Sequence, residues 1–132
     1  MREILITPEC LEFIDNQNIR VVNKFFHLVE IMEEMQIVHS NFVKKLKNSD
    51  FYELRIKAGN EIRVIMFAID HIDFSQCTKV ICLYGFVKKS NKDYKKAILT
   101  VTDGIPAQKL YESYGFKKYT SFNIITNEKR TL

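Results

Sequence analysis

Two arginines interrupt apolar, strand-like runs in the middle of the chain. Arg55 lies in residues 51–57 and Arg63 in residues 61–70, and both runs are otherwise rich in Ile, Val, Phe and Tyr, as β-strands are. A cation inside a half-buried strand costs free energy unless its side chain reaches a cleft or an anion. The two arginines therefore indicate a site for an anionic group.

The residue types around the arginines suit the cleavage of RNA without a metal ion. Such cleavage needs a 2′-hydroxyl held in line with the adjacent phosphate, and a cation that neutralises the charge of the transition state. Arginine binds phosphate oxygens bidentately. Lysine or tyrosine can transfer protons when its pKa is perturbed or a partner assists, and aromatic rings can stack on bases. One part of the chain supplies all of these types: Arg55, Arg63, Tyr84, Phe86, Lys88, Lys89 and Tyr94.

Positive charge is concentrated in the same part of the chain. Residues 41–96 carry twelve basic and six acidic side chains, a net charge of +6, whereas residues 1–40 carry −4 and residues 97–132 carry +2. A basic face predicts a polyanionic partner, with nucleic acid the first candidate, although a solvated lysine-rich surface would give the same pattern. The lysines of this segment that are expected to contact RNA phosphates are Lys44, Lys45, Lys47 and Lys92.

Other kinds of site find little support in the sequence. His27, His39 and His71 are far apart and have no zinc-like spacing with cysteines or carboxylates, and His27 is expected to be a core histidine. The four glycines are too scattered to form a nucleotide-binding loop. We therefore expect no metal and no cofactor, while a Cys–His nucleophile pair stays open.

Size and composition predict one domain with a substantial core. The chain has 132 residues, of which 46% are hydrophobic and 27% charged. Its three cysteines lack CxxC spacing and are expected to be reduced. No signal peptide is apparent, and no run approaches the ~18 apolar residues that span a bilayer. The expected location is the cytoplasm.

The periodicity of the apolar residues predicts helices first and strands afterwards. Residues 3–7 could form an edge strand, and the Thr-Pro-Glu sequence at 7–9 is typical of a helix start. Helical spacing predicts a longer helix over residues 19–35. Three strands are predicted over 51–57, 61–70 and 78–87, followed by a short helix within 90–102, a helix at 107–114 and a strand at 116–125.

The three strand-like runs resemble those of the RelE/HigB toxins of bacterial toxin–antitoxin pairs, and most closely the phage-derived HigB-like branch. Members of that branch have an "LyELR" strand, a "yRvlyf" strand, and an "LLHgFxKKtqktP" strand that leads into a helix. The matching segments here are YELRI at 52–56, IRVIMF at 62–67 and CLYGFVKKSNKDY at 82–94. The chain differs in having Tyr84 where histidine is common, and Tyr94 where proline usually follows the lysines.

The resemblance implies an α+β fold, in which an antiparallel sheet of about four strands packs against N-terminal helices, with an additional C-terminal helix. It also implies a ribosome-dependent mRNA endonuclease that is silenced by a cognate antitoxin, of the helix-turn-helix type. Carried over by position, Arg55 and Arg63 would grip the scissile phosphate and Lys88 and Lys89 would assist. Tyr84 completes the catalytic candidates, and Phe86 and Tyr94 join the lysines as RNA-binding candidates.

The tail has a second resemblance. Residues 99–122 resemble the C-terminal end of GNAT N-acetyltransferases, where a strand precedes an "A-xx-LYe-x-GF" helix, but the Q/R-x-x-G-x-G/A loop of that fold is absent from the sequence. We therefore predict a toxin domain over residues 1–98 and an extension over 99–132 that packs on it. A catalytically inactive toxin-like module that binds RNA or an antitoxin is the alternative function, and an acetyltransferase-related protein is a third.

Overall fold

The N-terminal segment forms a strand and two helices with defined caps. The structure is a computed structural model, and it describes residues 2–104, 116–118 and 125–127. Strand β1 (Glu3–Ile6) leads into α1 (Pro8–Asp15) and α2 (Ile19–Glu34). The Thr7 hydroxyl accepts a hydrogen bond from the Cys10 amide, and Asn18 accepts one from the Val21 amide, so each helix begins at a side-chain cap. The predicted helix starts are confirmed.

Five strands form the main sheet, in the order β1-β5-β4-β3-β2. The other four strands are β2 (Val43–Lys45), β3 (Phe51–Ala58), β4 (Asn60–Ala68) and β5 (Lys79–Val87). Strand β1 pairs with β5 in parallel, and the other neighbours are antiparallel. The predicted α+β class is confirmed, but the sheet has five strands rather than about four. The sequence did not reveal β2, because a three-residue edge strand of sequence Val-Lys-Lys carries no alternating apolar pattern.

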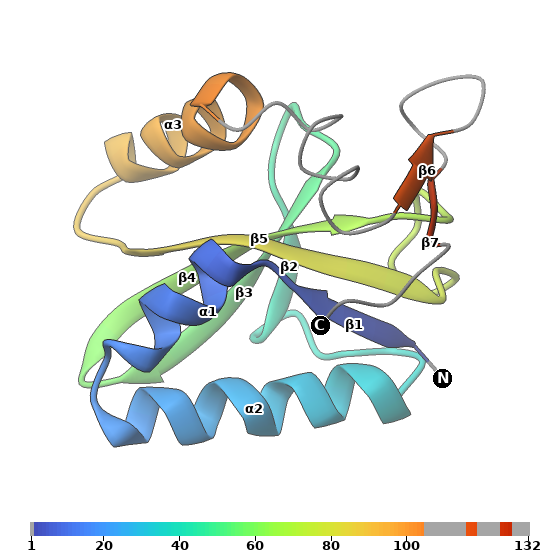
Figure 1. Cartoon of the computed structure of the whole chain (residues 1–132). Helices are drawn as coiled ribbons and strands as arrows, with labels where there is room; N and C mark the ends of the chain where they lie inside the picture. Colours follow the sequence, from blue (N-terminus) through green and yellow to red (C-terminus); the bar gives the residue numbers. More distant parts are fainter. Residues whose placement is uncertain (1, 105–115, 119–124, 128–132) are drawn as a thin grey trace.

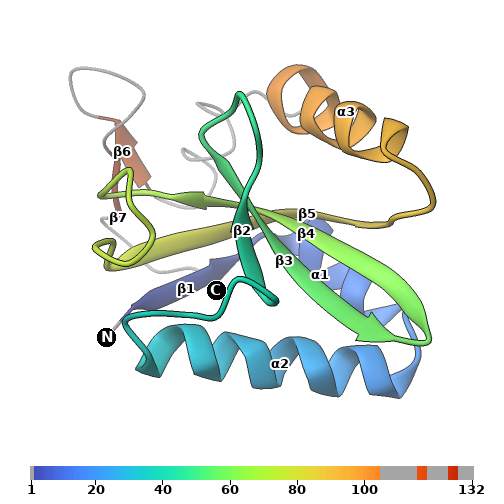
Figure 2. The ribbon, with the colours of Figure 1, turned by 180° about the vertical axis from the view of Figure 1, so that it is seen from behind.

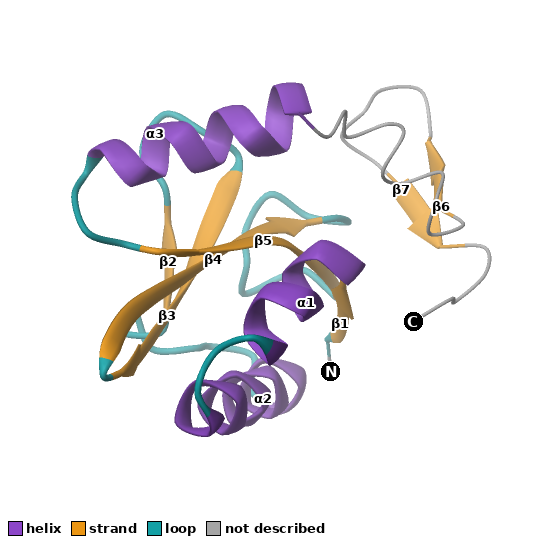
Figure 3. Cartoon of the chain, turned by 60° about the vertical axis from the view of Figure 1, so that its left-hand side comes forward, coloured by secondary structure: helices purple, strands orange, loops and turns teal. Residues whose placement is uncertain are grey.

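The two faces of the sheet are covered by different helices. Helices α1 and α2 pack on one face, where they form the larger apolar core with β3, β4 and β5. Helix α3 (Lys92–Leu99) lies over the other face (Figures 1 and 3). There Ala97 and Val101 pack in a second apolar cluster with residues that include Ile65 and Phe86. The α3 face is therefore the more open one and keeps room for polar groups.

The chain stays helical after α3, although residues 100–102 are all β-branched and so have low helix propensity. A π-helical turn spans Thr100–Gly104, and the hydroxyls of Thr100 and Thr102 donate to the carbonyls of Lys96 and Ile98. These bonds let the two β-branched residues continue the helix. Val101 is buried against the sheet, so packing outweighs local propensity here.

Close approach of α1 to the sheet requires a glycine in β5. A Cβ atom placed on Gly85 would lie 2.4 Å from Cδ2 of Phe13. The ring of Phe13 therefore occupies the space that a side chain at this position would fill. Helix α1 packs against β5 (Figure 3).

Several predictions from the sequence fall outside the described residues. They include the C-terminal helix at 107–114 and the middle of the strand at 116–125. What the structure describes of the tail is β6 (Phe116–Lys118) paired antiparallel with β7 (Ile125–Asn127). The division of the chain at residue 98 stays a prediction. In the part of the chain that the structure describes, no helix is both long and apolar enough to cross a membrane.

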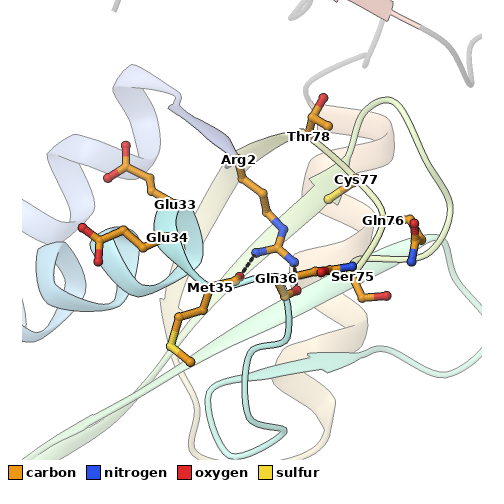
Figure 4. Close-up of a pocket in the computed structure, with 9 residues that line it drawn as sticks. All are labelled: Arg2, Glu33, Glu34, Met35, Gln36, Ser75, Gln76, Cys77 and Thr78. Atoms are coloured by element: carbon orange, nitrogen blue, oxygen red, sulfur yellow. Dashed lines mark hydrogen bonds between the residues drawn. The ribbon is translucent and has the colours of Figure 1, made fainter.

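A buried arginine fastens the beginning of the chain to the end of α2. The Arg2 guanidinium donates to the carbonyls of Met32 at 2.8 Å and Phe74 at 3.0 Å. It also donates to those of Met35 and Gln36 (Figure 4). These carbonyls lie at the C-terminal end of α2 and in the loop before β5, where a cation satisfies both the hydrogen bonds and the helix dipole. A polar cavity of about 250 Å³ adjoins Arg2, but none of the predicted site residues lines it.

Replacing Arg2 should destabilise the fold. Arg2→Ala leaves buried carbonyls without donors, so the free energy of unfolding should fall by about 2–4 kcal/mol, as measured by urea denaturation. Arg20→Ala, which removes an exposed arginine from α2, should change it by less than about 0.5 kcal/mol. Equal effects of the two substitutions would contradict the structural role of Arg2.

Candidate functional site

The predicted arginines meet directly on the α3 face of the sheet. Arg55 of β3 is paired with Arg63 of β4 in the register, and Arg63 is paired in turn with Phe86 of β5. Residues that are paired across antiparallel strands project from the same face. The three side chains therefore form one row across three strands. Two arginines that face each other repel, so this row needs a nearby anion.

The anion is Glu53, which the sequence analysis did not select. Its Oε1 atom accepts a hydrogen bond from Arg55 Nε at 2.8 Å, and its Oε2 atom lies 3.7 Å from Arg63 Nε. The Glu53 side chain is only 3% exposed, so the ion pairs lie in a poorly solvated environment, where charges interact strongly. The hydrogen bond to Glu53 raises the pKa of Arg55 above its usual value. The sequence does contain a signal for this pairing. Glu53 stands two residues before Arg55, and residues two apart in a strand project from the same face.

Tyr94 of α3 completes the contacts of Arg63. Arg63 Nε donates to the Tyr94 hydroxyl at 2.9 Å, while Nη1 donates to the Ile62 carbonyl at 3.1 Å and lies 3.3 Å from Glu61 Oε2. The Arg63 side chain is 3% exposed. Burial raises the pKa of Tyr94, with Glu53 as a further cause, although Arg63 opposes the rise. Tyr94 therefore stays protonated at neutral pH.

Aromatic rings surround this polar cluster. The rings of Tyr84 and Phe86 are stacked with centroids 6.3 Å apart, and Phe86 meets Tyr94 edge-on at 5.6 Å. Phe86 is buried, whereas Tyr84 and Tyr94 are partly exposed. The Lys88 ammonium lies 5.7 Å from the centre of the Tyr94 ring, within the range of a cation–π contact. The aromatic surfaces available to a ligand are therefore those of the two tyrosines.

The register divides the predicted lysines between two faces. Lys44 of β2 is paired with Glu53, so it projects on the side of the arginines, whereas Lys45 is paired with Tyr52 on the face that packs against α1 and α2. Lys47 is exposed between β2 and β3, at a loop that reaches towards α3 (Figure 2). The remaining two predicted lysines, Lys89 and Lys92, are exposed at the start of α3.

Helix α3 is fixed at its start by an acidic residue. Asp93 Oδ2 accepts hydrogen bonds from the amides of Lys89 at 2.6 Å and Ser90 at 2.8 Å. These bonds lower the pKa of Asp93, so its carboxylate is ionised at neutral pH. Asp93 stands one residue before Tyr94, so its carboxylate ties the first turn of α3 to the loop that follows β5.

The other chemistry considered from the sequence does not converge on a site. Burial raises the pKa of Cys10 to about 12, and it also raises those of Cys77 and Cys82, so these thiols are poor nucleophiles. His27 is exposed rather than a core residue, because it lies on the outer side of α2. Among the described residues, no three His, Cys, Asp or Glu side chains are grouped as a metal site would require.

Because Arg63 is more deeply buried than Arg55, replacing the two arginines should affect stability differently. Arg63→Ala leaves Glu53 without one of its two cations in a buried environment, so it should lower the free energy of unfolding by about 3–5 kcal/mol. Arg55 is 29% exposed, and Arg55→Ala should cost only about 1–2 kcal/mol. Urea denaturation of both variants tests this order, and a larger loss for Arg55→Ala would contradict the burial of Arg63.

Comparisons with known proteins place the chain in a family. A family model described as "Phage derived protein Gp49-like (DUF891)" matches residues 12–104. The crystal structure of the intact E. coli RelBE toxin–antitoxin complex is similar with a TM-score of 0.49 and 16% identity, over 68% of this chain and 100% of that chain. No curated protein matches the sequence significantly. The matched residues run from the second half of α1 through α2, the three long strands and α3, and the match confirms the resemblance to the phage-derived branch. The chain belongs to the phage-derived Gp49-like family.

Proposed function

We propose that the chain is the toxin of a toxin–antitoxin pair and that it cleaves ribosome-bound mRNA without a metal ion. The observation that supports this most is the row Arg55, Arg63 and Phe86, which meets Glu53 and Tyr94 on the α3 face of the sheet. Membership of the Gp49-like family agrees with it. In this proposal residues 1–98 form the toxin domain and residues 99–132 an extension.

The arginines have different roles in the proposed reaction. Arg55 is partly exposed, so its guanidinium can bind the scissile phosphate and stabilise the charge that develops on it. Arg63 is buried and contributes positive potential from inside the site, while it holds Tyr94 in position. Lys88, beside the Tyr94 ring, adds a second cation at the open edge. Tyr84 and Tyr94 offer partly exposed rings for bases.

Growth arrest tests the proposal in cells. Induced expression should stop bacterial growth, and Arg55→Ala should relieve the arrest, because the transition state loses its charge partner. Cleavage of ribosome-bound mRNA by purified Arg55→Ala should be slower by about a hundredfold or more. Arg63→Ala should also relieve arrest, but its expected loss of stability makes Arg63→Lys the better variant at that position. Arg20→Ala, on the opposite side of the molecule, serves as the control.

If Arg55→Ala were as toxic as the parent chain, the role of Arg55 would be wrong. Binding of RNA without any cleavage would instead favour the alternative of an inactive, RNA- or antitoxin-binding module. The observation behind that alternative is the engagement of Arg63 by Glu53, Glu61 and Tyr94. A neighbouring gene for a short helix-turn-helix protein would support the antitoxin partner.

The register of β2 supplies a matched pair for RNA binding. Lys44 lies on the face of the arginines and Lys45 on the other face, although both are exposed. Lys44→Ala should therefore weaken RNA binding and make its dependence on salt concentration shallower, because about one fewer counterion is released. Lys45→Ala should have the smaller effect, and Lys47→Ala should resemble Lys44→Ala. Affinities measured over a range of salt concentrations test this, and a larger loss for Lys45→Ala would contradict the proposed binding face.

A further inference from the structure

One oxygen of the buried carboxylate at the centre of the site is unused. Glu53 Oε1 is paired with Arg55 Nε at 2.8 Å, whereas Oε2 accepts no hydrogen bond within the part of the chain that the structure describes. Arg63 Nε is 3.7 Å from Oε2, beyond hydrogen-bonding distance. A buried acceptor without a donor is costly and rare, and it is often found at functional sites.

The Tyr94 hydroxyl is the group best placed to use this oxygen. Arg63 Nε lies within 2.9 Å of the Tyr94 hydroxyl and 3.7 Å of Glu53 Oε2, so both oxygens face the same nitrogen. In its bond to Arg63 the tyrosine oxygen is the acceptor, which leaves its own proton to be donated elsewhere. Tyr94 is also partly exposed whereas Glu53 is buried. A ligand can therefore reach the tyrosine but not the carboxylate.

We propose that Glu53 is the final proton acceptor of the cleavage step and that Tyr94 connects it to the RNA. This inference rests on the proposed nuclease function and names a group for proton transfer, which that proposal leaves open. Glu53 acts through Tyr94, so it is a positioning residue, while Tyr94 is the residue that touches the substrate. Each side chain alone is poorly suited to the task, because a neutral phenol is a weak base and the carboxylate is shielded from solvent.

The proposed step moves one proton from the RNA to Glu53. The RNA 2′-oxygen attacks phosphorus as its O–H bond breaks, and the proton passes to the Tyr94 oxygen. The original Tyr94 proton passes at the same time to Glu53 Oε2, so the phenol stays neutral. The bond between phosphorus and the 5′-oxygen breaks, which leaves a 2′,3′-cyclic phosphate, and the 5′-oxygen takes a proton from water. Glu53 then returns its proton to solvent through Tyr94.

Three cations from three strands surround Glu53. Arg55 on its own strand, Arg63 on β4 and Lys44 on β2 all project on its face of the sheet. Among the described residues, Glu61 is the only other carboxylate that forms an ion pair with this cluster. It is paired with Arg63 and Lys57 next to the turn between β3 and β4. Because a carboxylate can accept a proton only in its ionised form, the proposal predicts that the cleavage rate falls toward acidic pH.

The test is the pH profile of single-turnover cleavage of ribosome-bound mRNA by the full chain. For the parent chain, the rate should decrease at acidic pH. Glu53→Gln keeps the shape of the side chain but cannot accept the proton, so the rate should fall by about a hundredfold or more and the acidic decrease should disappear. Glu53→Asp keeps a carboxylate, so its slower reaction should retain the acidic decrease. Glu61→Gln neutralises the other carboxylate beside Arg63 and should also retain it.

A second variant keeps the test decisive if Glu53→Gln folds poorly. Tyr94→Phe removes only the hydroxyl, and it should slow cleavage to a similar degree. The double variant should be no slower than the slower single variant, because both residues belong to one path. Losses that multiply, or an acidic decrease that survives in Glu53→Gln, would overturn the role of Glu53 while leaving the nuclease proposal intact. A parent chain that cleaves no mRNA would overturn both.

Discussion

The structure depends on one electrostatic constraint, which is that two arginines stand opposite each other in adjacent strands. Arg55 and Arg63 are direct register partners, and like charges in that position repel. A single carboxylate, Glu53, lies against both guanidinium groups from a buried position. The three charges are mutually dependent, since loss of any one leaves the others unbalanced in a medium that solvates charge poorly.

Helix α3 links this cluster to the rest of the fold. Its Ala97 packs in the apolar cluster on the open face of the sheet, and its Tyr94 hydrogen-bonds to Arg63. The Asp93 carboxylate ties the first turn of the helix to the preceding loop. The same helix therefore closes part of the sheet and supplies a group of the site, so the position of α3 controls both burial and access.

The opposite face of the sheet supplies the rigidity. Helices α1 and α2 pack on it and form the main apolar core. Arg2, just before β1, connects the end of α2 to the loop before β5. With one face of the sheet packed against the helices, the register of β3, β4 and β5 is strongly specified, because a one-residue slip would turn the arginines into the core. The scaffold thus fixes which side chains share the open face.

The sequence alone determined the elements and the residue types of the site. Strand-like runs, the Thr7 cap and the apolar spacing of α2 are local signals, and each was visible because it depends on neighbouring residues. Arg55 and Arg63 were recognisable as cations in apolar strands. The motif over residues 52–94 by itself indicated the family.

Only the tertiary structure decided how these residues meet. Glu53 becomes central because the β3–β4 register places it between Arg55 and Arg63. Burial of Arg63 and the approach of Tyr94 depend on where α3 packs. The parallel pairing of β1 and the edge position of β2 were equally hidden. Each of these is a contact between residues that are not neighbours along the chain. Their energies come from burial and strand register, which local propensity does not encode.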